Sequence, residues 1–133
     1  MKIHHLGIVT DNVAGTLAAL GLKQSDISET VFDPVQKNNL HFIHLQENDL
    51  WLELVEPMSE DASTAKFAKK NGMGLHHLSM SSDDLDISEG IYAAMPSAFP
   101  LGRYKINVRS FGGNIETLFV AIKGLIIEFV KIR

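Results

Sequence analysis

The sequence contains no cysteine, which excludes disulfide bonds and thiolate metal ligands. It has no apolar run near the ~20 residues that span a bilayer, so we expect no membrane association. Its first residues show no signal-peptide pattern, so we expect a cytoplasmic protein. The net charge of −4 leaves no excess of Lys and Arg to neutralise phosphates, which argues against a nucleic-acid partner. Any metal ion must therefore be held by His, Asp, Glu or amide oxygen.

One short sequence motif, His-His-Leu followed by a small residue, occurs twice in the chain. His4-His5-Leu6-Gly7 and His76-His77-Leu78-Ser79 stand 72 residues apart in a sequence of 133. An acidic stretch follows each motif, at Asp11 and at Asp83. Repetition at about half the chain length indicates two copies of one supersecondary unit.

Hydrophobic periodicity predicts the order β-α-β-β-β in each half, and hence an α+β fold. The expected strands are Lys2–Val9, Ile27–Phe32, Leu40–Gln46, Leu50–Val55, Leu75–Ser81, Tyr104–Ser110, Glu116–Ile122 and Leu125–Ile132. The expected helices are Val13–Leu20, a linker helix Ser59–Asn71, and a helix that opens at Asp83, carries Ile87, Ile91, Ala94 and Met95 as its apolar residues, and stops at Pro96. Residues 96–102 are expected to form a loop. We predict a single domain over 1–133, with module one at 1–57, the linker helix within 58–72 and module two at 73–133.

A carboxylate lies among apolar neighbours on the last expected strand of each half, Glu53 in the first and Glu128 in the second. An unpaired charge buried in a strand costs several kcal/mol, so something must compensate it. A divalent cation held by two imidazoles and two carboxylates would be neutral overall, and that ligand set suits Zn, Ni, Co, Mn or Fe(II). Each of these residues alone is ordinary, because strand glutamates usually face solvent. Their joint placement, a His on the first strand and a Glu on the last, predicts a metal site.

Three segments carry a resemblance to a known family: His4–Val9, Leu52–Pro57 and, above all, Ala65–Leu78, in which the linker helix runs into Gly-Leu-His-His. With them the whole chain resembles the vicinal oxygen chelate (VOC) superfamily, which includes glyoxalase I, extradiol dioxygenases and bleomycin-resistance proteins. Methylmalonyl-CoA epimerase is the branch it resembles most. The resemblance implies two βαβββ modules paired into a cupped, mixed sheet, a homodimer, and a divalent metal ion. The ligands that it implies are His5, Glu53, His77 and Glu128.

Only one histidine of each repeated motif can face such a metal, because neighbouring strand residues point to opposite faces. The resemblance points to the second of each pair, His5 and His77. His4 and His76 would then serve packing or hydrogen bonding between the modules.

The resemblance implies a metal-dependent isomerase that exchanges the α-proton of an acyl-CoA through an enolate. Such a reaction needs a proton-transfer group on each face of the α-carbon. Glu128 would serve one face. Family members often carry a second carboxylate on the third strand of the first module, but here that strand has none, and we predict that His41 or His44 substitutes, with His41 nearer the cavity. The cations available for the CoA phosphates are Lys66, Lys69, Lys70 and Arg103.

Two other functions stay open at this point. A glyoxalase-I-type lactoylglutathione lyase uses the same ligand types on a glutathione thioester-type substrate. A binding or resistance protein would sequester a small molecule without moving a proton, and it would need the cup but not the metal.

Overall fold

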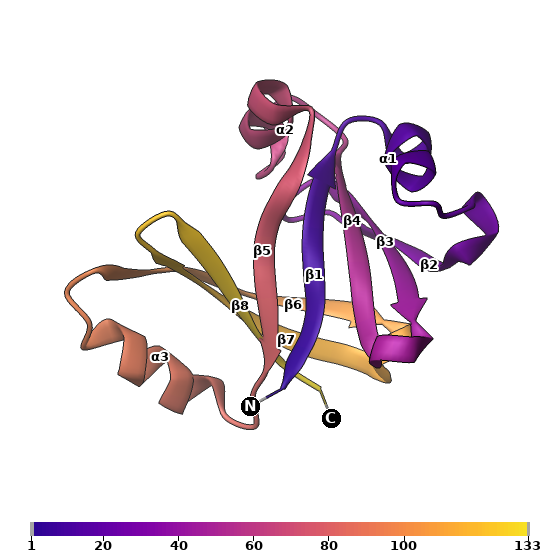
Figure 1. Cartoon of the computed structure of the whole chain (residues 1–133). Coiled ribbons are helices and arrows are strands. Elements are labelled where there is room, and N and C mark those ends of the chain that lie inside the picture. Colours follow the sequence, from indigo (N-terminus) through magenta and orange to yellow (C-terminus); the bar gives the residue numbers. More distant parts are fainter. Residues whose placement is uncertain (1, 133) are drawn as a thin grey trace. The chain divides into compact units, whose positions relative to one another are not determined.

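The computed structural model describes residues 2–132, whose eight strands are hydrogen-bonded in the order β2-β3-β4-β1-β5-β8-β7-β6 (Figure 1). The strands are β1 (Ile3–Thr10), β2 (Ile27–Asp33), β3 (Asn38–Leu45), β4 (Leu50–Pro57), β5 (Met73–Ser81), β6 (Ala98–Val108), β7 (Gly113–Ile122) and β8 (Leu125–Lys131). The helices are α1 (Val13–Ala19), α2 (Ala65–Asn71) and α3 (Leu85–Ala93). The sheet is mixed, since β5 and β8 are parallel whereas β7 and β8 are antiparallel. None of the helices within 2–132 is long and apolar enough to cross a membrane.

The element order confirms the predicted repeat. β1-α1-β2-β3-β4 is followed, after α2, by β5-α3-β6-β7-β8. The chain divides into two compact units: an N-terminal unit of residues 6–76, and a C-terminal unit that joins the residues up to His5 to the segment from His77 onward. These boundaries fall inside β1 and β5.

In the N-terminal unit, α1 packs on one face of β3 and β4. Its core consists of Leu17 on α1, Ile43 on β3, and Leu52 and Leu54 on β4. The helix begins where the Asn12 side chain accepts a hydrogen bond from the Gly15 amide at 3.0 Å. Because side chains alternate across a strand, Phe42 and its pairing partner Glu53 lie on the face of β3 and β4 opposite α1.

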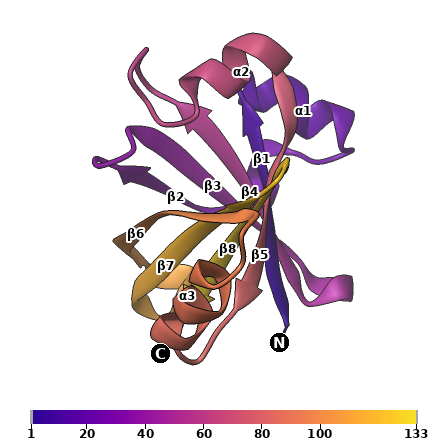
Figure 2. The ribbon, with the colours of Figure 1, turned by 90° about the vertical axis from the view of Figure 1, so that its left-hand side faces the viewer.

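In the C-terminal unit, α3 packs against β6, β7 and β8 (Figure 2). The core of this unit consists of Leu85, Ala98, Leu118, Val120 and Phe129, with Tyr92 packed against it. The Asp84 side chain accepts hydrogen bonds from the amides of Asp86 and Ile87 and so caps the helix.

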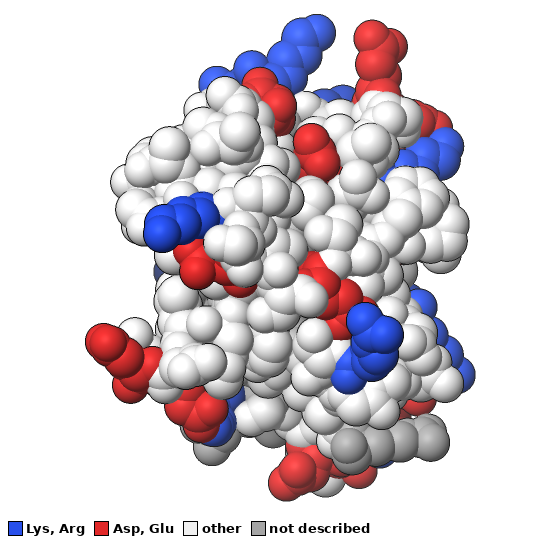
Figure 3. Space-filling view, turned by 90° about the vertical axis from the view of Figure 1, so that its right-hand side faces the viewer, with Lys and Arg blue, Asp and Glu red and all other residues white. Residues whose placement is uncertain are grey.

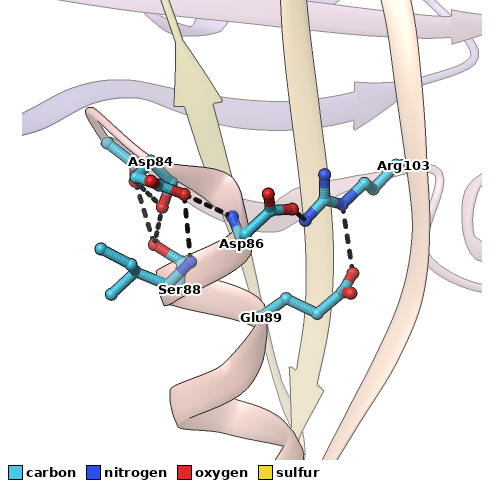
Figure 4. A network of polar contacts seen from close by, with 7 residues as sticks. Asp84, Asp86, Ser88, Glu89 and Arg103 are labelled. Carbon is cyan, nitrogen blue, oxygen red and sulfur yellow. Dashed lines mark hydrogen bonds and ion pairs between the residues drawn. The ribbon is translucent and has the colours of Figure 1, made fainter.

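Several charged side chains at the surface lie beside charges of the opposite sign. On the face shown in Figure 3, Lys and Arg side chains neighbour Asp and Glu side chains in several small groups. Figure 4 shows a charged group elsewhere on the surface, in which Arg103 of β6 contacts Asp86 at 2.6 Å and Glu89 at 3.2 Å on α3. Each exposed pair of this kind contributes about 0–1 kcal/mol, so the apolar core decides how firmly α3 is held.

The predicted apolar face of α3 was wrong. Ile87 and Ile91 are 63% and 52% exposed, whereas Leu85 is 3% exposed. The helix begins at Leu85 and not at Asp83, and a residue two positions further on points about 200° away around a helix of 3.6 residues per turn. Leu85 and Tyr92, seven residues apart, therefore face the core, and the isoleucines face away from it.

Two element starts also differ from the prediction. The linker helix was expected from Ser59, but α2 begins only at Ala65, and residues 59–64 form turns. The expected loop 96–102 is mostly strand, because β6 begins at Ala98. β6 can contain Pro100 because it is the last strand in the order, where a missing amide donor is tolerated, and the pairing shifts between Pro100 and Gly102.

We expect Leu85→Ala to lower the free energy of unfolding by about 2–5 kcal/mol, because it removes a buried side chain that anchors α3. Ile87→Ala, two residues away on the exposed side of the same helix, is the matched control and should change it by less than about 0.5 kcal/mol. Urea denaturation followed by circular dichroism measures both. Equal losses in the two variants would contradict the packing described here.

Candidate metal centre

The second histidine of each repeated motif is the buried one. His5 on β1 is 2% exposed and His77 on β5 is 4% exposed, whereas His4 and His76 are only partly buried. The rings of His4 and Phe111 meet edge to face with centroids 4.5 Å apart, and His76 meets Phe67 in the same way at 5.2 Å. The strand alternation inferred from the sequence therefore holds on both strands.

In the C-terminal unit, two imidazoles and one carboxylate converge. Nε2 of His5 lies 3.3 Å from Nε2 of His77. Oε1 of Glu128 lies 2.7 Å from Nε2 of His5 and 3.8 Å from Nε2 of His77. Glu128 is 5% exposed, so all three groups are buried. Strands β1, β5 and β8 thus bring together three of the four residues proposed from the sequence.

The two histidines beside Glu128 stabilise the ionised form of its carboxyl group. Burial acts to raise the pKa of this carboxyl group, but the interactions with His5 and then His77 outweigh burial and lower the pKa to about 2. Among residues 2–132, Oε1 of Glu128 nevertheless has no well-formed hydrogen bond. When His5 and His77 are neutral, as metal-binding imidazoles are, this buried oxygen has no positive charge beside it, and a bound cation would supply one.

Aromatic rings surround these polar groups. The Phe119 ring meets the His77 ring edge to face at 5.5 Å, and the Phe111 ring lies nearly parallel to the His5 ring at 6.4 Å. Sequence reasoning missed both rings. Phe119 had a usable signal, because Lys123-Gly124 between two strands is typical of a two-residue hairpin turn, and counting back from it pairs Phe119 with Glu128, as observed. Phe111 precedes the two glycines Gly112 and Gly113 and had no such signal.

Ser79 was also missed. It lies directly opposite Glu128 in the parallel pairing of β5 with β8 and is fully buried. Its interaction with the Glu128 carboxylate contributes to the lowered pKa of that group. The signal for Ser79 was its position two residues after His77, which places both side chains on one face of β5.

Glu53, the fourth proposed residue, lies in the N-terminal unit. It is 7% exposed on β4, on the face opposite α1, and its pairing partner Phe42 is 1% exposed. A buried glutamate next to a buried phenylalanine fits the expectation that Glu53 lies in an apolar strand environment.

The predicted orientation of His41 was wrong. His41 pairs with Leu54 in the β3–β4 register and shares the α1 face with Ile43, so it points away from the face of Glu53. Its Nε2 lies 3.1 Å from Glu56 Oε1, and its Nδ1 lies 2.9 Å from the Thr30 hydroxyl. The error has a simple cause, since a register that is wrong by one residue exchanges the two faces of a strand.

His44 lies on the same face as Glu53 because it pairs with Trp51. Its ring stacks on the Trp51 indole with centroids 4.6 Å apart and planes inclined by 22°. The side chain is 33% exposed, and Nε2 lies 3.9 Å from Asp49 Oδ1. His44 is therefore placed at the end of β3 next to the turn that leads to β4.

Residues 4–95, well over half of the chain, match the Glyoxalase/Bleomycin resistance protein/Dioxygenase superfamily. The chain belongs to this family. This result confirms the superfamily that the sequence was seen to resemble. No curated protein sequence matches the chain.

Several solved structures share the fold of this VOC protein. Methylmalonyl-CoA epimerase from Mycobacterium tuberculosis matches with a TM-score of 0.79 and 19% identity, over 99% of this chain and 88% of that one. A single-residue variant of the Streptomyces coelicolor methylmalonyl-CoA epimerase, in complex with 2-nitronate-propionyl-CoA, matches with a TM-score of 0.76 and 22% identity. The match covers 98% of this chain and 96% of that one. A methylmalonyl-CoA epimerase in complex with methylmalonyl-CoA and NH4+ matches with a TM-score of 0.75 and 22% identity. This match covers 98% of this chain and 93% of that one. At these identities the similarity establishes the fold and leaves the activity to the chemistry of the site.

Proposed function

We propose that this VOC protein is a metal-dependent isomerase that exchanges the α-proton of an acyl-CoA thioester, as in methylmalonyl-CoA epimerases. The observation that supports it most is the convergence of His5, His77 and Glu128 at buried positions, where Glu128 keeps an ionised oxygen without a hydrogen bond. A protein that only sequestered a small molecule would have no use for this arrangement. The similarity to epimerase structures supports the same reaction class.

The donor atoms suit a divalent ion. Zn–N bonds of about 2.0–2.1 Å in a tetrahedral site place two donors about 3.4 Å apart. The two Nε2 atoms of His5 and His77 are 3.3 Å apart, close to that separation. Neutral imidazoles with carboxylates suit Co, Zn, Ni, Mn or Fe(II). A bound ion would act as a Lewis acid on the thioester carbonyl oxygen, a contribution worth several kcal/mol.

Glu53 is proposed as the fourth metal ligand because it occupies the same place in the first module as Glu128 does in the second. Glu128 lies on β8, next to β5, which carries His77; Glu53 lies on β4, next to β1, which carries His5. His5, Glu53 and His77 are all buried, and each offers a metal-binding atom. Two carboxylates and two neutral imidazoles would balance the charge of a divalent ion and so remove the cost of burying Glu53 and Glu128.

The proton chemistry is assigned first to Glu128. Its carboxylate is ionised at neutral pH because its pKa is lowered, so it can accept a proton from the α-carbon of a bound thioester. The aromatic rings of Phe111 and Phe119 lie beside the two histidines that neighbour this carboxylate. The proton held by Glu128 is then replaced by one from solvent, and its return to the enolate regenerates the thioester with exchanged hydrogen.

The phosphates of a CoA substrate need cations. Lys66, Lys69 and Lys70 are exposed on α2, and the last two lie in its final turn. Arg103, the other cation considered from the sequence, is already engaged with Asp86 and Glu89. We therefore propose the lysines of α2, and not Arg103, as the contacts for the phosphates.

The test is α-proton exchange in deuterated water. We expect the purified protein with a bound divalent ion to incorporate one deuterium into methylmalonyl-CoA, measured by mass spectrometry. The same preparation should leave the glutathione–methylglyoxal hemithioacetal unchanged. Conversion of the hemithioacetal without exchange into any acyl-CoA would instead establish the lyase. Tight binding of methylmalonyl-CoA with no exchange at all would show that the protein is only a binding protein.

A further inference from the structure

Two buried side-chain atoms among residues 2–132 lack a well-formed hydrogen bond: the hydroxyl oxygen of Ser79 and Oε1 of Glu128. They belong to neighbouring residues of the C-terminal unit, because Ser79 lies directly opposite Glu128 in the parallel pairing of β5 with β8. Side chains of residues paired in this way lie on the same face of the sheet. Ser79 is 0% exposed and Glu128 is 5% exposed. A buried donor and a buried acceptor, both unsatisfied, therefore lie next to each other.

The Ser79 hydroxyl has a cost for the fold. A buried polar group that has lost its water costs free energy unless another partner replaces that water, and alanine would fill the same position without this cost. The next residue on this face of β5, Ser81, does have a partner, since its hydroxyl donates to the Lys2 carbonyl at 3.1 Å. A fully buried hydroxyl kept without such a partner calls for a reason other than stability.

The carboxylate of Glu128 needs a donor that metal binding does not consume. His5 and His77 are nearest to its Oε1 through Nε2, at 2.7 Å and 3.8 Å, and an Nε2 that binds a metal ion carries no proton to donate. Nδ1 of His5 lies instead 2.8 Å from Nδ1 of His4. Burial raises the pKa of Glu128, whereas His5, His77 and then Ser79 lower it, so the hydroxyl is close enough to favour the ionised carboxylate.

We propose that Ser79 is the positioning residue of Glu128: its hydroxyl donates to one carboxylate oxygen and thereby fixes the direction of the other. The inference rests on the proposed function, in which Glu128 binds the metal ion and accepts the α-proton. The serine side chain is shorter than that of glutamate, so its hydroxyl holds the carboxylate from the side of the sheet and leaves the other side free for proton transfer. Removing a hydrogen-bond partner of a metal-binding carboxylate lowers metal affinity or activity about 10- to 100-fold.

The test is Ser79→Ala, measured first without any assay of activity. Competition against a fluorescent chelator should show a loss of Zn²⁺ affinity of about 10- to 100-fold. Thermal unfolding of the chelator-treated protein should have a midpoint equal to or above that of wild type, because the variant removes an unsatisfied buried hydroxyl. Ser81→Ala makes the same change two residues further along the same face of β5, and this control should bind Zn²⁺ within about twofold of wild type.

A double-mutant cycle with Glu128→Ala shows whether Ser79 acts through Glu128. In that background, which lacks the carboxylate, Ser79→Ala should change Zn²⁺ affinity by less than about twofold. With the metal site saturated, Ser79→Ala alone should lower kcat for α-proton exchange about 10- to 100-fold and leave KM within about threefold, since the hydroxyl does not bind the substrate.

Zn²⁺ affinity of Ser79→Ala within threefold of wild type would overturn the inference. Equal losses of affinity with and without the Glu128 carboxylate would also overturn it, since Ser79 would then support the fold and not Glu128. The proposed function can fail separately. A wild type that binds Zn²⁺ and exchanges no acyl-CoA with any divalent ion would exclude the isomerase, whereas a non-additive cycle in Zn²⁺ affinity would still support Ser79 as the residue that positions Glu128.

Discussion

Replacing Glu128 with glutamine is expected to lower the rate of α-proton exchange at least ~1,000-fold. The amide cannot accept the α-proton, and proton transfer by a positioned base is worth about 100- to 10,000-fold. The amide also removes a negative charge that lies 2.7 Å and 3.8 Å from the two buried histidines, which weakens metal binding. Both losses act on the same reaction, so the effect should be among the largest of any single substitution.

The matched control is Glu116→Gln on β7, a partly buried glutamate that pairs with Lys131 at the far end of the β7–β8 register. It should keep exchange within about twofold of wild type. Thermal unfolding of both variants separates catalysis from folding. An exchange rate for Glu128→Gln within tenfold of wild type, in a folded protein, would remove Glu128 from the chemistry.

Replacing His77 with alanine is expected to lower metal affinity at least ~100-fold. The substitution deletes one of two Nε2 atoms that lie 3.3 Å apart, so a first-row ion would lose one imidazole ligand. Competition against a fluorescent chelator measures the affinity directly, without any assay of activity.

The neighbouring histidine provides the control for this experiment. His76 points to the opposite face of β5, against Phe67, so His76→Ala should bind metal within about threefold of wild type. The pair of variants tests the strand alternation and the metal site together. Equal loss of affinity in both, or in neither, would be incompatible with His77 as a ligand.

Much of the fold followed from the sequence because the repeat is strong. The two copies of His-His-Leu predicted two β-α-β-β-β modules, and strand alternation correctly separated buried His5 and His77 from their neighbours. The placement of Glu128 beside these histidines could also be anticipated, since first and last strands of such a module are neighbours in the sheet.

The predictions for α3 and for the segment around Pro100 were wrong for identifiable physical reasons. The periodicity of α3 suggested Ile87 and Ile91 as the buried face, but the Asp84 cap starts the helix at Leu85, and the core receives Leu85 and Tyr92. Pro100 suggested a loop, although an edge strand tolerates a proline. Hydropathy does not specify where a helix starts or which strand lies at the edge.

The change of face along β2 could not be predicted from the sequence for another reason. Period-2 alternation assigns Ile27 and Glu29 to one face, and only the pairing of β2 with β3 reveals the bulge that separates them. The same kind of one-residue uncertainty put His41 on the wrong face of β3. Register depends on contacts between strands, so it could be read only from the structure.

The central claim is that a metal held by the buried histidines and carboxylates drives α-proton exchange. The most direct measurement is the rate of deuterium incorporation into methylmalonyl-CoA, taken with the metal content of the same sample before chelation, after chelation and after a divalent ion is returned. The account predicts that exchange follows bound metal, disappears with it and returns with it. Exchange at an unchanged rate in the metal-free protein, or no exchange in the metal-loaded protein, would contradict it.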